Sequence, residues 1–404
     1  MSTTRKTPKL RFPEFTDDWE QRKLGDLAEI VGGGTPSTSK DEYWDGEIDW
    51  YAPAEIANQI YVESSERKIT SEGLNNSSAK MLPVGTVLFT SRAGIGKMAI
   101  LRKEACTNQG FQSIVPHVNE LDSYFIFSRS EELKRYGETV GAGSTFVEVS
   151  GKQMSAMPLM MPPTIDEQRK IGEYFSSLDN LITLHQRELD SLKKLKKSLL
   201  QKMFPKNGEK IPELRFPEFT GDWEQRKLGD ITDSFSGGTP KVGNEEYYGG
   251  EIPFIRSAEI NSSTTELYIT KKGLDNSSAK MVSKGTILYA LYGATSGECG
   301  ISQIDGAINQ AILAIKPKCG YVPYFISTWL RRSKFSIVST FLQGGQGNLS
   351  GEIVKNLSLM LPCQNEQKKI GELFKKLDST ITLHQRELDT LKKLKKGLLQ
   401  NMFV

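Results

Sequence analysis

The sequence predicts an α+β protein with two mixed α/β globular domains, joined by two long helices that pair as an antiparallel coiled coil. The length of the chain, an internal repeat and a heptad pattern at the end of each repeat predict this class. The chain has 404 residues, more than one ordinary domain holds. With 25% charged and 37% hydrophobic residues, it has enough apolar side chains to build compact cores.

The internal repeat has a period of roughly 200 residues. Residues 10–26 read LRFPEFTDDWEQRKLGD and residues 214–230 read LRFPEFTGDWEQRKLGD, so only Asp17 and Gly221 differ. Further matched pairs follow along the chain: Gly33–Pro36 with Gly237–Pro240, Asn76–Met81 with Asn276–Met281, and Asn108-Gln109 with Asn309-Gln310. This period is too long for a solenoid. Each copy is therefore expected to be a domain followed by an appendage.

The first part of each copy has the composition of a small sheet-containing domain. It is rich in Gly, Ser, Thr and aromatic residues, with many turn signals. Short β-type runs such as Gly85–Thr90 and Gly285–Ala290 lie between these turns. We expect a mixed α/β domain with a compact sheet in each copy.

The second part of each copy is predicted to be one long helix of some 36–38 residues, about 55 Å. Pro162-Pro163 and Pro362 lie just upstream, and Pro205 ends the first helix. Two series of residues step alternately by four and three and are mostly apolar, as in a coiled-coil seam. From these series we expect seam contacts from Ile171, Phe175, Leu178, Ile182, Leu189, Leu192, Ile370, Phe374, Leu377, Ile381, Leu388 and Leu391; Leu199, Met203, Leu398 and Met402 continue the apolar series.

His185, His384, Lys196 and Lys395 occupy the polar positions of the same series, where we expect the two histidines to be structural. A helix of this length needs a partner for its apolar face, and the other copy supplies an equal one. The alternative is that each helix packs on its own domain.

A pseudo-twofold axis perpendicular to the helices would make them antiparallel, with the domains at opposite ends of a rod. The expected boundaries are 1–162 for the first domain, 163–204 for the first helical spacer and 205–213 for a linker. The second domain then covers 214–362 and the second helical spacer 363–404.

Several classes of protein are disfavoured by the composition. The four cysteines form no CxxC pair and there are only three histidines, so we expect neither a zinc site nor a disulfide framework. No run approaches the roughly 18 apolar residues that a membrane helix needs, and no apolar segment follows the basic start. We expect a cytoplasmic protein without membrane contact.

No catalytic motif is complete. The run Gly94–Lys97 resembles a phosphate loop, but Ser91 stands where its first glycine belongs and Met98 follows the lysine. Asp166 and Glu167 lie at the start of a predicted helix, where acidic side chains interact favourably with the helix dipole. We expect no catalytic residue, no metal site and no cofactor bound by this chain.

The loops that differ between the two copies are the candidate binding residues. Inside an otherwise matched frame, Ser91–Gly96 corresponds to Leu291–Gly297. Arg, Lys, Tyr, Ser, Asn and Gln side chains in such loops can hydrogen-bond base edges and phosphates. We expect base contacts from Arg92, Lys97, Ser144, Thr145, Arg256, Tyr292, Gln346 and Asn348, and phosphate contacts from Lys40, Lys80, Lys241 and Lys280. Neutral drift of surface loops is the alternative.

The motifs in their doubled order resemble the specificity (S) subunit of type I restriction-modification systems. The resemblance covers essentially the whole chain. Its signals are Trp19 with Leu24-Gly25, Gly33–Pro36, the segment from Gly85 to Gly96, Asn108-Gln109, and Pro162 with Glu167-Gln168, each with a counterpart in the second copy. The second copy departs from the pattern where Leu291–Gly297 replaces Arg92-x-Gly94-x-Gly96.

The resemblance implies that each domain is a target-recognition domain for one half of a split, asymmetric double-stranded DNA sequence. The paired helices would then set the spacing of the half-sites and bind two modification (methylase) subunits, which use S-adenosylmethionine. Restriction subunits that use ATP and Mg would complete the endonuclease. This chain itself would be non-catalytic. We expect methylase contacts at Leu10, Phe12, Phe15, Trp19, Phe216, Phe219 and Trp223.

Two other functions are compatible with the same residues. One is a two-domain adaptor that binds protein or glycan ligands through its loops. The other is a nuclease or methylase whose site is not evident from the motifs.

Overall fold

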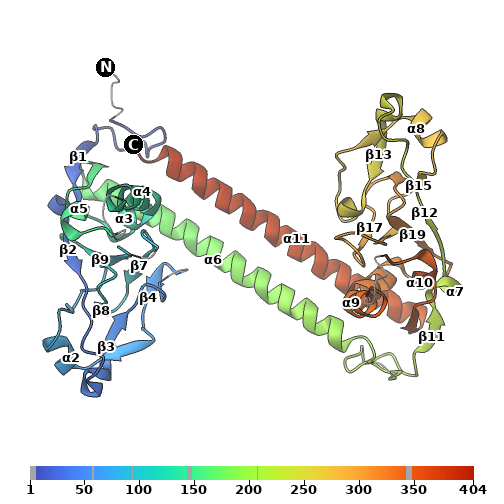
Figure 1. The fold of residues 1–404 in the computed structure, drawn as a ribbon, viewed down its shortest axis with the longest axis horizontal. Coiled ribbons are helices and arrows are strands. Elements are labelled where there is room, and N and C mark those ends of the chain that lie inside the picture. Colours follow the sequence, from blue (N-terminus) through green and yellow to red (C-terminus); the bar gives the residue numbers. More distant parts are fainter. Residues whose placement is uncertain (1–5, 57–58, 93, 143–147, 207, 343–347) are drawn as a thin grey trace. The chain divides into compact units, whose positions relative to one another are not determined.

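A computed structural model describes residues 6–56, 59–92, 94–142, 148–206, 208–342 and 348–404 of the chain. The chain forms two compact units. The first contains Met1–Gln186 and Glu387–Val404, and the second contains Arg187–Arg386. Each unit therefore holds one globular domain and a part of both long helices (Figure 1).

The first domain is built on a five-stranded and a three-stranded sheet. The order in the larger sheet is β2-β9-β6-β7-β4, and in the smaller sheet β5-β3-β8. A two-stranded ribbon pairs β1 with β10 in antiparallel register, Glu20 opposite Met161. The strands are β1 (Glu20–Lys23), β2 (Ala28–Gly32), β3 (Trp44–Tyr51), β4 (Tyr61–Val62), β5 (Arg67–Ile69), β6 (Val87–Phe89), β7 (Met98–Leu101), β8 (Cys106–Thr107), β9 (Gln112–Pro116) and β10 (Pro158–Met161).

The second domain repeats this plan with two four-stranded sheets and the same kind of ribbon. The sheet orders are β12-β19-β16-β17 and β14-β13-β18-β15, and β11 pairs with β20. The strands are β11 (Glu224–Lys227), β12 (Thr232–Ser236), β13 (Tyr248–Ile255), β14 (Tyr268–Ile269), β15 (Lys280–Val282), β16 (Ile287–Ala290), β17 (Cys299–Ile301), β18 (Gly306–Ile308), β19 (Ile312–Pro317) and β20 (Ser358–Leu361). The predicted β-runs after Gly85 and Gly285 are confirmed as β6 and β16.

Short helices close both domains. In the first domain they are α1 (Leu24–Leu27), η1 (Asp41–Tyr43), α2 (Ser71–Asn75), α3 (Ser123–Ser128), α4 (Ser130–Gly141) and α5 (Gly151–Ser155). In the second they are α7 (Leu228–Ile231), η2 (Glu245–Tyr247), η3 (Ser257–Glu259), α8 (Lys271–Asp275), α9 (Pro323–Phe341) and α10 (Gly351–Lys355). The single helix α9 stands where the first domain has the two helices α3 and α4.

The two predicted long helices are confirmed as α6 (Ile165–Lys202) and α11 (Gln364–Asn401), each of 38 residues. All twelve apolar residues predicted for their seam are buried or half-buried. Full burial of a large apolar side chain stabilises by roughly 1.5–3 kcal/mol, and half-buried side chains contribute less. Ile171, Phe175 and Leu178 pack in the core of the first unit, and Ile370, Phe374 and Leu377 pack in the core of the second.

Within each unit, the two helices run antiparallel. In the first unit, Phe175 of α6 stacks on Phe403 just after α11, and further along α6 the carboxylate of Asp179 binds Lys395. In the second unit, Lys196 of α6 pairs with Asp378 of α11, and Phe204 lies beside Phe374. In both units rising residue numbers on α6 meet falling numbers on α11.

The start of each long helix carries a buried glutamate that anchors the segment preceding the domain. The Glu167 carboxylate, fully buried, accepts two hydrogen bonds from Arg11 at 2.7 and 2.8 Å and one from Trp19 Nε1 at 3.2 Å. In the second unit Glu366 accepts two bonds of 2.8 Å from Arg215. The repeated LRFPEF and DWEQ segments therefore have a structural role that both copies share.

A second carboxylate, buried in the first unit and half-buried in the second, joins three elements in each unit. In the first unit the Tyr124 hydroxyl of α3 donates to Asp179 of α6 at 2.9 Å, and Lys395 of α11 binds the same carboxylate at 2.6 and 2.7 Å. We call this group, and its counterpart around Asp378 in the second unit, the aspartate junction. Lys196 and Lys395, the two lysines at seam positions, belong to these junctions.

The end of α11 has the same role in the first unit as the end of α6 has in the second. The Leu10 amide donates to Asn401 at 2.9 Å, and the Leu214 amide donates to Lys202 at 2.8 Å. As Figure 1 shows, the C-terminus lies beside the start of the first domain. The arginines Arg129 and Arg332 stack over Phe403 and Phe204, respectively.

We predict that Glu167→Ala destabilises the first unit by about 3–5 kcal/mol, because it leaves a nearly buried guanidinium without its counter-ion. Urea denaturation followed by fluorescence measures the loss. Glu173→Ala, at an exposed position of the same helix, is the matched control and should change the unfolding free energy by less than about 0.5 kcal/mol. Equal losses in the two variants would contradict the anchoring role.

We predict that the stabilisation from Asp378 disappears in acid. Burial raises the pKa of Asp378, but the hydrogen bonds from Lys196 and Tyr324 outweigh burial and hold the pKa below its ordinary value of 3.8. As the pH falls through 3.8, the unfolded chain takes up this proton before the folded one does, and stability is lost until the folded pKa is passed. The difference in urea midpoint between the wild type and Asp378→Asn should therefore be constant above about pH 5 and shrink below pH 3.8. For the control Asp233→Asn, at an exposed position, the difference in urea midpoint from the wild type should not shrink below pH 3.8.

Candidate nucleic-acid interface

In each domain the motifs shared by the two copies meet at one end of the sheets. Thr35 follows β2, Gln109 follows β8, and the Thr35 hydroxyl donates to the Gln109 side chain. The same bond joins Thr239 to Gln310 in the second domain. Both glutamine side chains are exposed. A polar rim of the same construction is therefore present in both units.

Glycine is required at this rim because chain segments approach each other closely. A Cβ on Gly33 would lie 2.0 Å from the Asn108 carbonyl oxygen, and one on Gly237 would lie 1.9 Å from the Ile308 carbonyl oxygen. The next glycine, Gly34, lies equally close to Ser78 and Ala79 in the shared NSSAKM segment. The repeated Gly-Gly-Thr-Pro motif is thus explained by backbone packing.

In the first domain the structure brings the ends of the predicted reading loops to this rim. The Ser91 amide donates to Gly110 at 2.8 Å, and the Val149 amide donates to Ser91 at 3.1 Å. Arg92, with 46% of its side chain exposed, forms an ion pair of 2.7 Å with Glu148. Lys97 is exposed in the same loop. The predicted residues Ser144 and Thr145 lie outside the described residues.

In the second domain different side chains occupy the same place. Tyr292 forms an isolated antiparallel bridge with Asn348, and the Leu349 amide donates to Leu291 at 2.8 Å. Burial raises the pKa of Tyr292, while a side-chain hydrogen bond with Gln310 acts against it. Asn348 is exposed. The predicted residue Gln346 lies outside the described residues.

Arg256 follows β13 but already has two acidic partners. Its guanidinium binds Glu259 at 2.9 Å and Glu266 at 2.8 Å, and these hydrogen bonds raise the pKa of the arginine. Any contact with DNA would require exchange of these ion pairs. Arg256 therefore differs from Arg92, which has one acidic partner among the described residues.

The four lysines predicted to contact phosphate are all exposed: Lys40, Lys80, Lys241 and Lys280. Lys40 donates to the Tyr43 hydroxyl at 2.8 Å, which raises the pKa of the lysine. Lys280 lies 5.4 Å from the ring centre of Phe235. Within the described part of the chain, the ammonium groups of Lys80 and Lys241 have no side-chain partner. Exposed ammonium groups of this kind can bind phosphate oxygens.

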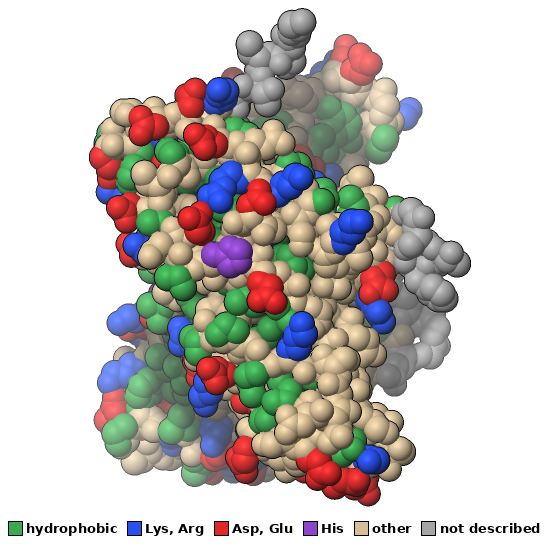
Figure 2. Space-filling model, turned by 90° about the vertical axis from the view of Figure 1, so that its left-hand side faces the viewer, with side chains coloured by type: hydrophobic (Ala, Val, Ile, Leu, Met, Phe, Trp, Pro, Cys, Tyr) green, Lys and Arg blue, Asp and Glu red, His purple; other side chains and the backbone are tan. Residues whose placement is uncertain are grey.

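Among the described residues on the face drawn in Figure 2, charged side chains of one sign do not gather in a patch. On the face drawn in Figure 2, basic and acidic side chains are interspersed. DNA binding by charge alone needs basic residues gathered on one face. This face is therefore a weaker candidate for contact with DNA than the loop rim.

The residues predicted to contact a methylase fall into two groups. Trp19 and Trp223 are only 1% exposed and belong to the cores of their units, so in this structure neither indole can be reached from outside. Phe12, Phe15, Phe216 and Phe219 are half-buried, and Leu10 is 47% exposed. Only this second group offers surface to another protein.

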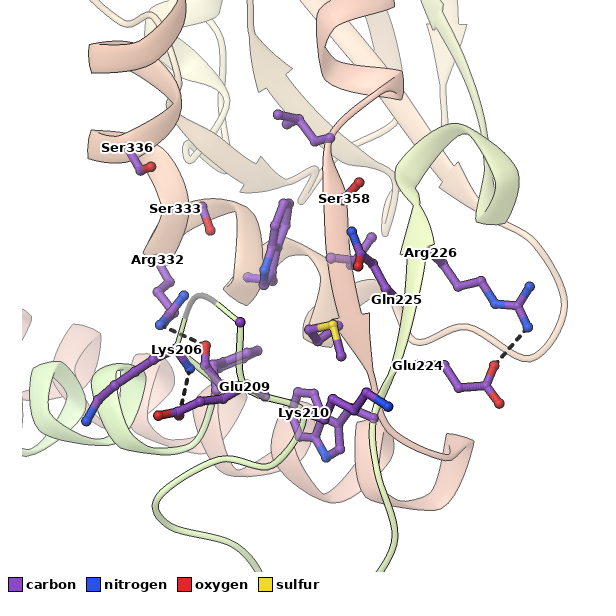
Figure 3. Close-up of a pocket in the computed structure, with 18 of the residues that line it drawn as sticks. Lys206, Glu209, Lys210, Glu224, Gln225, Arg226, Arg332, Ser333, Ser336 and Ser358 are labelled. Atoms are coloured by element: carbon purple, nitrogen blue, oxygen red, sulfur yellow. Dashed lines mark hydrogen bonds and ion pairs between the residues drawn. The ribbon is translucent and has the colours of Figure 1, made fainter.

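The cavity drawn in Figure 3 contains charged groups but no catalytic pair. It has a volume of about 840 Å³ and lies in the second unit between the linker, α9 and the β11-β20 ribbon. Arg226 binds Glu224 at 2.8 Å, and Lys210 binds Asp222 at 3.3 Å. The described residues that line it include no histidine and no cysteine. Lys206, Lys210 and Arg226 each have an acidic partner, and among the described lining residues no general base lies beside a nucleophile.

The thiols also have the properties of structural residues. All four cysteines are free. Burial raises the pKa of Cys106 to about 11 and that of Cys299 to about 12, so both remain protonated at neutral pH. Cys319 and Cys363 are exposed.

The structure adds Gln109 and Gln310 to the candidate site. The sequence had indicated these two glutamines only as members of motifs that both copies share. Their amides are exposed at the rim, where a glutamine side chain can pair with adenine. The signal that could have identified them is their recurrence, each preceded by asparagine, in both copies. Among the described residues, no helix is both long enough and apolar enough to cross a membrane.

The chain is similar to known specificity proteins over nearly its whole length. The family model described as type I restriction modification DNA specificity domain matches twice, at residues 16–194 and 220–393. The specificity subunit of the type I restriction enzyme MjaIX from Methanocaldococcus jannaschii is 28% identical over 400 residues, which cover 95% of this chain and 92% of that protein. The EcoR124I/EcoR124II specificity subunit from Escherichia coli is 31% identical over 180 residues, 43% of each chain.

The fold has a counterpart among solved structures. The crystal structure of the type I restriction-modification S subunit from M. genitalium matches with a TM-score of 0.67 and 16% identity, covering 98% of this chain and 99% of that one. This match extends across both copies of the repeat. From the doubled family match, we conclude that the chain belongs to the family of type I restriction-modification DNA specificity subunits.

Proposed function

We propose that each globular domain reads one half of a bipartite, asymmetric double-stranded DNA target. The observation that carries this proposal is the rim at which the shared motifs meet. The same threonine–glutamine pair recurs in both domains, but it is bordered by Arg92 and Glu148 in one and by Tyr292 and Asn348 in the other. Equal frames with unlike side chains suit two readers of unlike sequences.

In this proposal the two long helices pair as an antiparallel coiled coil and set the spacing of the half-sites. The antiparallel contacts within each unit and the burial of the seam residues support it. A 38-residue helix is about 57 Å long, while half-sites read from one face of DNA recur about every 34 Å. The two lengths are of the same order, so a helix of this length can span half-sites one turn apart.

The proposed division of labour follows the expected boundaries: recognition domains at 1–162 and 214–362, helical spacers at 163–204 and 363–404, and a linker at 205–213. Two methylase subunits would bind the helices and the segments around Phe12 and Phe216. These subunits would bring S-adenosylmethionine, and restriction subunits would bring ATP and Mg. Such a complex acts on cellular DNA in the cytoplasm.

We predict that cells expressing this chain with its partner methylase carry adenine methylation at one split motif with two unlike halves and a fixed spacer. Genome-wide mapping of methylated adenine measures this. Cells with the methylase alone are the control and should lack the motif. A continuous motif, a palindromic one or no methylation would contradict the proposal.

We predict that Arg92→Ala weakens recognition of one half-site only, by about 1–3 kcal/mol, because an arginine bound to a base edge contributes that much discrimination. The same mapping should show relaxed base preference in one half of the motif and none in the other. Arg102→Ala, an exposed arginine of the same domain paired with Glu63, is the matched control. Unchanged methylation in both variants would rule out this role for Arg92.

A further inference from the structure

We propose that the aspartate junctions fix each recognition domain at a set orientation on the helices, and that Asp179 and Asp378 are positioning residues for the half-site spacing. The inference rests on the proposed function for its link to spacing. The junction itself rests on contacts within each unit.

In the first unit the junction lies inside the protein core. Asp179 is 6% exposed, and its carboxylate receives the Tyr124 hydroxyl at 2.9 Å and the Lys395 ammonium at 2.6 and 2.7 Å. Tyr124 belongs to the domain, Asp179 to α6 and Lys395 to α11. One carboxylate thus joins the domain to both helices.

In the second unit the same three elements meet with the helices exchanged. The Asp378 carboxylate, on α11, receives Tyr324 at 2.5 Å and Lys196 of α6 at 2.5 Å. The domain adds a second contact here, because Arg331 of α9 binds the same carboxylate at 2.7 Å. The recurrence of tyrosine, aspartate and lysine in both units indicates a shared role.

The physical character of the junction suits an orienting role. Apolar packing is non-directional, whereas hydrogen bonds to a carboxylate weaken steeply when distance or angle changes. A buried charge that loses a partner is strongly destabilised, so at Asp179 the three elements cannot rotate against one another at low cost. The carboxylate and its partners therefore define the angle between the domain and the helices more sharply than apolar packing does.

The cavity beside the second junction increases this need. A cavity of about 1030 Å³ lies between the domain and α11, and its lining includes Tyr324, Arg331 and Asp378. At the cavity itself, solvent replaces apolar contact between the domain and α11, so the core formed with Ile370 and Phe374 does not extend there. The junction at the wall of the cavity supplies a direct link.

The sequences of the two long helices also support an orienting role for the junctions. Lys196 and Lys395 occupy seam positions, where an apolar residue would pack better, and a polar residue at such a position specifies geometry at some cost in stability. Their neighbours Lys193 and Lys392 are exposed. Within each LKKLKK motif, one lysine therefore acts in the junction while its neighbours face solvent.

If the junction sets the angle between domain and helices, its loss should widen the range of spacer lengths that are methylated. The bases recognised in each half-site should stay the same. The test removes one side-chain partner of an aspartate at a time, in the full chain co-expressed with its methylase. The variants are Tyr124→Phe, Tyr324→Phe, Lys395→Met and Lys196→Met. Mapping of methylated adenine gives the ratio of methylation at the wild-type spacing to that at spacings one base pair longer or shorter. We expect this ratio to fall about tenfold in the tyrosine variants, equivalent to about 1.4 kcal/mol, with both half-site sequences unchanged.

Matched controls separate orientation from general destabilisation. Tyr174→Phe alters a tyrosine that is 40% exposed on α6, and Lys392→Met alters an exposed lysine of the same motif as Lys395. Both controls should keep the wild-type ratio. A loss of methylation that is equal at every spacing, or an unchanged ratio in all four junction variants, would overturn the proposal.

Hydrogen exchange of the purified chain makes the result independent of DNA. Tyr124→Phe should speed exchange in α3 and in the α6 segment around Asp179, while the sheet of the first domain keeps its protection. If the wild type itself yields no split motif, the proposed function fails. Faster hydrogen exchange confined to the residues around the aspartate junction would then still support its structural role. Unchanged hydrogen exchange would refute that role.

Discussion

The whole structure depends on one constraint: each 38-residue helix has a single apolar face, which must be buried along its length. Neither domain covers such a face alone. Each unit solves the problem by combining a domain with parts of both helices. The anchors at Glu167 and Glu366 and the aspartate junctions then add polar contacts of fixed geometry to this apolar core. As a specificity subunit, the chain is the non-catalytic part of its restriction-modification complex.

Local patterns in the sequence were sufficient to predict the long helices, the repeat and one strand in each domain, β6 and β16. The heptad series predicted the buried residues of α6 and α11 because helical periodicity is a local property. The division of the helices between two units could not be predicted in the same way. It depends on contacts such as Arg11 with Glu167 and Asp179 with Lys395, which join residues 156 and 216 positions apart.

The candidate site was predictable in outline but not in its details. Divergence between the copies indicated the loops around Arg92 and Tyr292, which the structure places beside the shared motifs. It could not show that Arg256 is held by two glutamates or that Trp19 is enclosed in the core. Residue type says what a side chain can bind. Its neighbours in space decide whether it is available.

The exchange of helix ends between the two copies has an evolutionary consequence. Each domain is completed by the end of the helix that follows the other copy, with Phe403 and Phe204 in equivalent places. A single copy of this repeat would have to complete its domain with the helix end of a second molecule. Because the tandem repeat supplies both partners in one polypeptide, its two halves can carry different residues.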